Sequence, residues 1–123
     1  MTEHFPKSDF EIMVMDQEPK CRLMPGLIVR PFGFTVRETD SVKGAMLMLK
    51  KYPIRVIFLG SGGGDRNHFV AHLKSAVPYE VVTVLYGDEV PESGMDFEYR
   101  VQRPPVSTEL LGTIEAISSR LKH

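Results

Sequence analysis

The stretch VIFLGSGGGD, residues 56–65, begins as an uninterrupted run of apolar residues and ends in a run of glycines. A short apolar run that stops at turn-forming residues is typical of a β-strand buried on both faces, as in parallel sheets covered by helices. In open α/β sheets, ligands and reacting groups gather at the carboxyl ends of such strands. The stretch therefore predicts an α/β fold and also the place where a functional site would lie.

Around this strand, short runs rich in Val, Ile, Phe and Met alternate with segments of helical period. The alternation predicts strands at residues 11–15, 35–38, 55–59, 81–86 and 98–102. Five strands with intervening helices fit a flavodoxin-like, doubly wound parallel sheet of order 2-1-3-4-5.

Apolar stripes with helical spacing predict the helices between these strands. The stripes comprise Val42, Ala45, Met46 and Leu49; then Phe69, Val70 and Leu73; then Leu110, Leu111, Ile114, Ile117 and Leu121. A first helix is expected over residues 18–29. We expect a kink or break at Pro25–Gly26, because proline lacks the backbone N–H that a helix needs.

Composition limits what the chain can be. With 123 residues, 42% of them hydrophobic, and a formal net charge of −1, the chain fits one compact domain over residues 1–123 with no electrostatic attraction to nucleic acid. Cys21 is the only cysteine, which excludes a disulfide framework and suits a reducing cytoplasm. No apolar run is long enough to span a membrane. We therefore predict a soluble cytoplasmic domain.

The predicted topology brings two polar segments together. In the order 2-1-3-4-5, the crevice lies at the carboxyl ends of the first and third strands. The first strand runs into IMVMDQEP, which places Asp16, Gln17 and Glu18 opposite Gly60 and the glycines that follow it. Any chemistry of this domain is expected there.

These residues resemble the response-regulator receiver domain, or CheY-like domain. In that family the first strand ends in paired acids followed by Glu-Pro, the third in a phospho-accepting Asp, the fourth in Thr or Ser, and the fifth in Lys-Pro. The likeness covers nearly the whole chain, with Tyr52–Pro53 before the third strand and Arg103–Pro104 where Lys-Pro would stand. It implies that the Arg103–Pro104 peptide bond is cis.

The chain departs from the family where phosphorylation would occur. Phosphoryl transfer to Asp needs a carboxylate nucleophile and a magnesium ion held by several oxygen ligands. The acceptor position falls on Gly60, or on Leu59 if the register differs by one, and Gln17 replaces one of the paired acids. The resemblance thus implies a vestigial phosphorylation site formed by Asp16, Gln17, Gly60, Tyr86 or Gly87, and Arg103. We predict a vacated acceptor site refilled by the glycine loop, with no enzymatic activity, metal or cofactor.

A narrower resemblance concerns the regulatory head of flagellar activators. The motifs LGS, GDEVP and RPP, after the third, fourth and fifth strands, are similar to those of the atypical N-terminal receiver domain of FleQ-type, sigma-54-dependent transcription activators. Residues 87–102 are short for a strand-to-strand connection with a helix and hold Pro91 and Gly94. The fourth helix of the family is therefore expected to be shortened or missing.

Protein contact is the predicted mode of action, through a homodimer or an attached output domain. Phe97, Tyr99 and Arg100 belong to the residue types that dominate interface hot spots, and the edge strand that carries them is expected to be less covered than in an ordinary receiver. In the opposing interpretation, Phe97 and Tyr99 pack inward and Arg100 is merely solvated. We predict no direct contact with nucleic acid or membrane.

The sequence offers two alternative sites. Ser61, Gly62, Gly63 and Gly64 could form a nest for an anion or nucleotide beside Arg103, which would make the domain a small-ligand sensor. The loop lacks the Lys-Ser/Thr ending of a P-loop, which favours a simple connector. His68 and His72 have a spacing that can chelate a metal, but without a third ligand we predict no metal site.

Overall fold

The core of the fold is a five-stranded parallel sheet of order β2-β1-β3-β4-β5. The computed structural model describes residues 10–61, 66–87 and 97–121. Its strands are β1 (Glu11–Met15), β2 (Val36–Thr39), β3 (Ile54–Leu59), β4 (Val82–Tyr86) and β5 (Tyr99–Val101). The predicted α/β fold and strand order are confirmed, and the strand limits differ from prediction by no more than one residue at either end.

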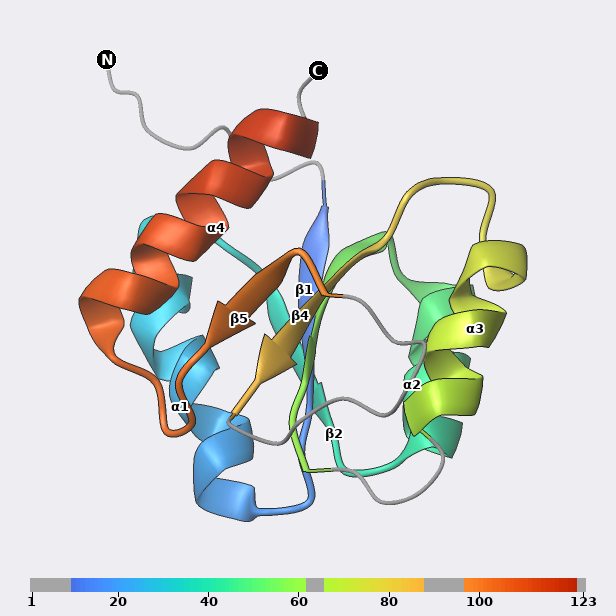
Figure 1. Cartoon of the computed structure of the whole chain (residues 1–123), viewed down its shortest axis with the longest axis horizontal. Coiled ribbons are helices and arrows are strands. Elements are labelled where there is room, and N and C mark those ends of the chain that lie inside the picture. The colour runs from blue at the N-terminus through green and yellow to red at the C-terminus, as the bar shows by residue number, and fades with distance from the viewer. Residues whose placement is uncertain (1–9, 62–65, 88–96, 122–123) are drawn as a thin grey trace.

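Helices cover both faces of the sheet. Figure 1 shows α1 (Pro19–Val29) and α4 (Ser107–Leu121) on one face, with α2 (Val42–Lys51) and α3 (Arg66–Ala76) on the other. A short 3-10 helix, η1 (Arg30–Phe32), follows α1. Residues 88–96, where the shortened or missing fourth helix of the family was expected, lie outside the described residues.

The alternation of side chains along β3 builds two cores. Val56 and Phe58 join the cluster under α1 and α4, whereas Ile57 and Leu59 join the cluster under α2 and α3. All four side chains are buried, because a strand in the middle of a covered sheet has no face toward water. This explains why the opening stretch is continuously apolar.

The helical stripes bury the expected residues. Ala45 and Leu49 of α2, Phe69 and Leu73 of α3, and Leu110, Ile114 and Ile117 of α4 are buried. The Ser41 side chain caps α2 by accepting the Gly44 N–H at 3.0 Å, which satisfies one of the unpaired donors of its first turn. Among the described residues, no helix is long and apolar enough to cross a lipid bilayer.

The expected break in the first helix is not observed. α1 continues through Pro25 to Val29, and both Pro25 and Gly26 are buried within it. The prediction considered the donor that proline removes but not a different donor for the freed carbonyl, and the structure supplies one from β4, as described below.

Candidate functional site

The carboxyl ends of four strands meet at one edge of the sheet. Asp16 follows β1, Gly60 follows β3, Tyr86 ends β4, and Arg103 lies just beyond β5. The backbone ties the two central ends together, because the Gly60 N–H donates to the Met15 carbonyl at 2.8 Å. The predicted convergence of these residues is therefore what the structure shows.

Asp16 is the centre of this edge. Its side chain is completely buried and accepts two hydrogen bonds from Arg103, from Nε to Oδ2 at 2.7 Å and from Nη2 to Oδ1 at 3.0 Å. Its Oδ1 also accepts the Glu18 N–H at 2.9 Å. The planar guanidinium of arginine is suited to such a bidentate pair with a carboxylate. A lysine could not reproduce this geometry. The hydrogen bonds to Asp16 raise the pKa of Arg103 above its ordinary value, so the guanidinium stays protonated.

The space beside Gly60 is filled by Asp16. A Cβ added at Gly60 would lie 2.7 Å from Asp16 Cγ and closer still to Oδ2, a separation that real Cβ atoms essentially never show. The expectation that the glycine loop refills a vacated site stays untested, because Gly62, Gly63 and Gly64 lie outside the described residues. The described structure shows instead that the Asp16 carboxylate, directly after β1, occupies the place of a side chain at position 60. The alternative acceptor, Leu59, points into the core under α2 and α3.

Tyr86 and Gly87 are the two residues expected at the end of the fourth strand, where receiver domains carry a Thr or Ser hydroxyl. The Tyr86 ring is 2% exposed, packs edge-to-face on Phe58 and donates its hydroxyl to the Cys21 carbonyl of α1 at 2.8 Å. Burial raises the pKa of Tyr86. Gly87 has φ +126°, and its amide donates to the Val101 carbonyl at 2.9 Å. That backbone conformation favours glycine, and the chain turns there past the Arg103 side chain.

Three features of the site were not found from the sequence. The Glu18 side chain caps α1 by accepting the Cys21 N–H at 2.8 Å, and this bond lowers the pKa of Glu18. Arg22 donates to the Asp16 backbone carbonyl at 3.1 Å. The Tyr86–Cys21 bond could have been suspected, because a proline inside a helix frees the carbonyl four residues earlier.

Other sequence predictions have mixed outcomes. The Arg103–Pro104 peptide bond is cis, as expected. Gln17 is exposed, and its N–H donates to the Ser61 carbonyl at 2.7 Å. The anion-nest residues Gly62, Gly63 and Gly64 lie outside the described residues, so that prediction stays untested. Within residues 10–61, 66–87 and 97–121, no three His, Cys, Asp or Glu residues gather closely enough to hold a metal ion.

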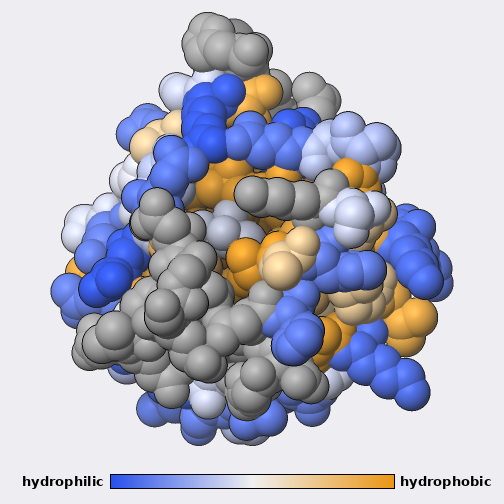
Figure 2. Space-filling view, turned by 45° about the vertical axis from the view of Figure 1, so that its right-hand side comes forward, coloured by the Kyte–Doolittle hydropathy of each residue, from blue (hydrophilic) through white to orange (hydrophobic). Residues whose placement is uncertain are grey.

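The proposed interface residues differ in exposure. Phe97 is partly buried against the core under α2 and α3, Tyr99 is partly buried against the opposite core, and Arg100 is exposed. Large exposed hydrophobic residues lie elsewhere in the described chain, at Leu23, Leu27, Phe32, Leu47 and Val106. On the side seen in Figure 2, hydrophobic residues form separate patches between hydrophilic ones.

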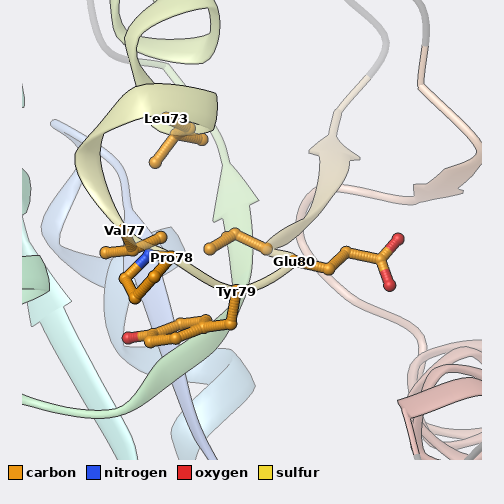
Figure 3. A pocket seen from close by; sticks show the side chains of 6 residues that line it. Leu73, Val77, Pro78, Tyr79 and Glu80 are labelled. Carbon is orange, nitrogen blue, oxygen red and sulfur yellow. The ribbon is translucent and has the colours of Figure 1, made fainter.

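A pocket of about 450 Å³ lies at the other end of the sheet, between the end of α3 and the start of β4. It is lined by Leu73, Val77, Pro78, Tyr79, Glu80 and Val81 (Figure 3). The Glu80 carboxylate pairs with Arg120 of α4, and Figure 3 shows it pointing away from the apolar side chains. The pocket is separate from the Asp16–Arg103 pair.

Comparison with known proteins identifies the fold of the chain through solved structures. No protein-family model matches the chain, and none of the curated proteins matches it in sequence. Solved structures do match it. A two-component response regulator from Clostridium difficile superposes with a TM-score of 0.78 at 12% identity, covering 94% of this chain and 100% of that one.

Two further structures agree. A CheY-like receiver domain protein from Methanospirillum hungatei gives a TM-score of 0.76 at 18% identity, covering 91% of this chain and 96% of that one. The chemotaxis response regulator CheY4 of Vibrio cholerae gives 0.71 at 14% identity, covering 89% and 99%. The fold is that of a CheY-like receiver domain. At these identities the likeness establishes the receiver fold, and the role of each residue must come from this chain's own geometry.

Proposed function

We propose that this receiver-fold domain is regulatory, acts through protein contacts and is not phosphorylated. One observation carries the proposal: the space for a side chain at position 60 holds the buried Asp16 carboxylate, paired with Arg103. An acceptor aspartate has no room there. Asp16 itself accepts three hydrogen bonds, so little of its carboxylate is left to coordinate magnesium.

The finer assignment rests on the short motifs noted in the sequence. We propose that the domain is the N-terminal regulatory head of a sigma-54-type flagellar activator, as LGS, GDEVP and RPP suggest. The reading frame that encodes it tests this directly. A sigma-54-type ATPase domain encoded after His123 would support the assignment, and an unrelated domain there would remove it.

A small-ligand sensor is the second candidate. The Arg103 side chain retains 27% exposure at the mouth of the crevice, which leaves part of the guanidinium reachable by an anion. Against this, an anion would have to compete with a carboxylate that already makes two hydrogen bonds to the same group. Titration with inorganic phosphate and with AMP, followed by the NMR signals of Arg103 and Ser61, distinguishes the two candidates: saturable shifts support the sensor.

Phosphodonors are expected to leave the domain unmodified. With acetyl phosphate and magnesium, intact-mass spectrometry should show no stoichiometric gain, because neither Gly60 nor Leu59 carries a nucleophile. Beryllofluoride should leave the amide shifts of Asp16 and Gly60 in place. An ordinary receiver domain treated in parallel provides the positive control. A full mass gain on this chain would overturn the proposal.

The contact face is proposed to lie on β5 and α4, because Arg100 on β5 and Val106, directly before α4, are exposed. Because Tyr99 is partly buried, Arg100→Glu and Val106→Ser are better probes than a change at Tyr99. Each is expected to weaken self-association, or binding to the attached output domain, by about tenfold or more in Kd while leaving the unfolding midpoint nearly unchanged. Analytical ultracentrifugation measures the effect.

The control for this face is Leu47→Ser on α2, which removes an even more exposed apolar side chain from the opposite side of the sheet. It should leave association intact. If Leu27→Ser on α1 weakens association and Arg100→Glu does not, the contact lies on α1 and the β5–α4 assignment is wrong.

A further inference from the structure

A proline inside α1 leaves one carbonyl without its helical donor. In an α-helix the N–H of residue 25 would donate to the carbonyl of residue 21, and Pro25 has no N–H. The helix nonetheless continues to Val29, and Pro25 is buried within it. The Cys21 carbonyl can therefore receive a donor from outside the helix.

That donor is the hydroxyl of Tyr86. The ring enters the core from the end of β4, 65 residues further along the chain, and its hydroxyl lies 2.8 Å from the Cys21 oxygen. With 2% exposure, Tyr86 has almost no access to water, and an unpaired hydroxyl there would cost free energy. The Tyr86 hydroxyl and the Cys21 carbonyl thus supply each other with a hydrogen-bond partner.

We propose that Pro25, the Cys21 carbonyl and Tyr86 form a link that couples the position of α1 to the end of β4. Pro25 acts as a positioning residue, because it withholds the competing N–H and leaves the carbonyl to the tyrosine. If position 25 held a residue with a backbone N–H, that N–H would donate to the Cys21 carbonyl within the helix. The buried Tyr86 hydroxyl would then contribute less to stability.

The link reaches the crevice because α1 also holds Asp16. The Glu18 N–H, at the start of the helix, donates to Asp16 Oδ1, and Arg22 donates to the Asp16 backbone carbonyl. Gly87 directly follows Tyr86, and a Cβ added there would lie 3.3 Å from Cδ of the Arg103 side chain that pairs with Asp16. A partner that displaces α1 therefore acts on both Tyr86 and the Asp16–Arg103 pair.

This inference deepens the proposed function, because it names the element through which a protein contact would alter the crevice. Its test is nevertheless independent of phosphorylation. The competing view is that Tyr86 only fills space beside Phe58, with which it makes an edge-to-face contact. In that case phenylalanine would serve as well, and the residue at position 25 would not matter to it.

A double-mutant cycle separates the two views. Tyr86→Phe is expected to raise the unfolding equilibrium constant about five- to tenfold in the native background, because the partly buried Cys21 carbonyl loses a donor. In a Pro25→Ala background, the restored N–H can donate to Cys21, and the same change should cost less than about twofold. Chemical denaturation of the four proteins measures both steps. Equal losses in the two backgrounds, or no loss in either, would overturn the link.

Amide hydrogen exchange supplies a second measurement that does not depend on the Pro25→Ala variant folding. Under native conditions, Tyr86→Phe should speed exchange at the amides of α1 about fivefold, while those of α2, on the other face of the sheet, keep their rates. If exchange in α1 is unchanged, or if α1 and α2 change equally, Tyr86 does not couple β4 to α1. In that event the proposed function would stand and only this inference would be lost.

Discussion

Gly60→Ala is expected to destabilise the fold by about 2–4 kcal/mol. The added Cβ would fall 2.7 Å from Asp16 Cγ, so the carboxylate or the end of β3 must move. Neither can move cheaply, because Asp16 is buried and held by Arg103, and the Gly60 N–H is bonded to Met15. Thermal or urea unfolding measures the loss.

Gly112→Ala is the matched control for this change. A Cβ at Gly112 meets no atom within 4 Å, and the residue lies within α4. Alanine is the better helix former, so this variant should gain about 0.5–1 kcal/mol. If Gly60→Ala is instead as stable as the wild type, Asp16 does not occupy the acceptor space, and the main argument against phosphorylation fails.

Arg103→Ala is expected to cost about 3–5 kcal/mol, because it leaves the completely buried Asp16 carboxylate without its cation. Arg103→Lys should recover part of the loss, since an ammonium restores the charge but not both hydrogen bonds. Adding Asp16→Ala to Arg103→Ala should also recover stability, because the unpaired charge is then gone. Urea unfolding of the single and double variants measures these differences.

A surface ion pair provides the comparison for Arg103. Arg30 pairs with Glu38 at 2.9 Å, but its side chain is 44% exposed, so Arg30→Ala should cost about 1 kcal/mol or less. If the losses for Arg103 and Arg30 are alike, the crevice is well hydrated and Asp16 is not locked. Such a result would favour the ligand-sensor candidate, because Arg103 would then be free to meet an anion.

Both predictions concern residues that the sequence identified but could not arrange. The end of β1 and the end of β3 were expected to meet, since the order of a doubly wound sheet brings them together. Gly60 was expected to lack a phospho-accepting side chain simply because glycine has none. What fills its place depends on the side-chain direction of Asp16, which no spacing along the chain encodes.

The first helix also shows what the sequence alone could not predict. Local rules correctly recognised that Pro25 removes a helical hydrogen bond, and from that alone they predicted a kink or break. The helix is continuous, and Tyr86, remote in sequence, donates to the carbonyl that Pro25 frees. This hydrogen bond comes from a strand distant in sequence, so a prediction from local helix propensity cannot account for it.

The sequence by itself determined the doubly wound parallel sheet, because continuous apolar strands, helical stripes and turn residues each act over a few neighbouring positions and all indicate one topology. It also determined that the residue directly after β3 is Gly60 and not a carboxylate. Only the tertiary structure decided that Asp16 turns into the space beside Gly60 and that Arg103 closes over it from beyond β5. Asp16 and Arg103 are 87 positions apart, and the free energy of their pairing depends on burial and on hydrogen-bond geometry, which exist only once the sheet has assembled.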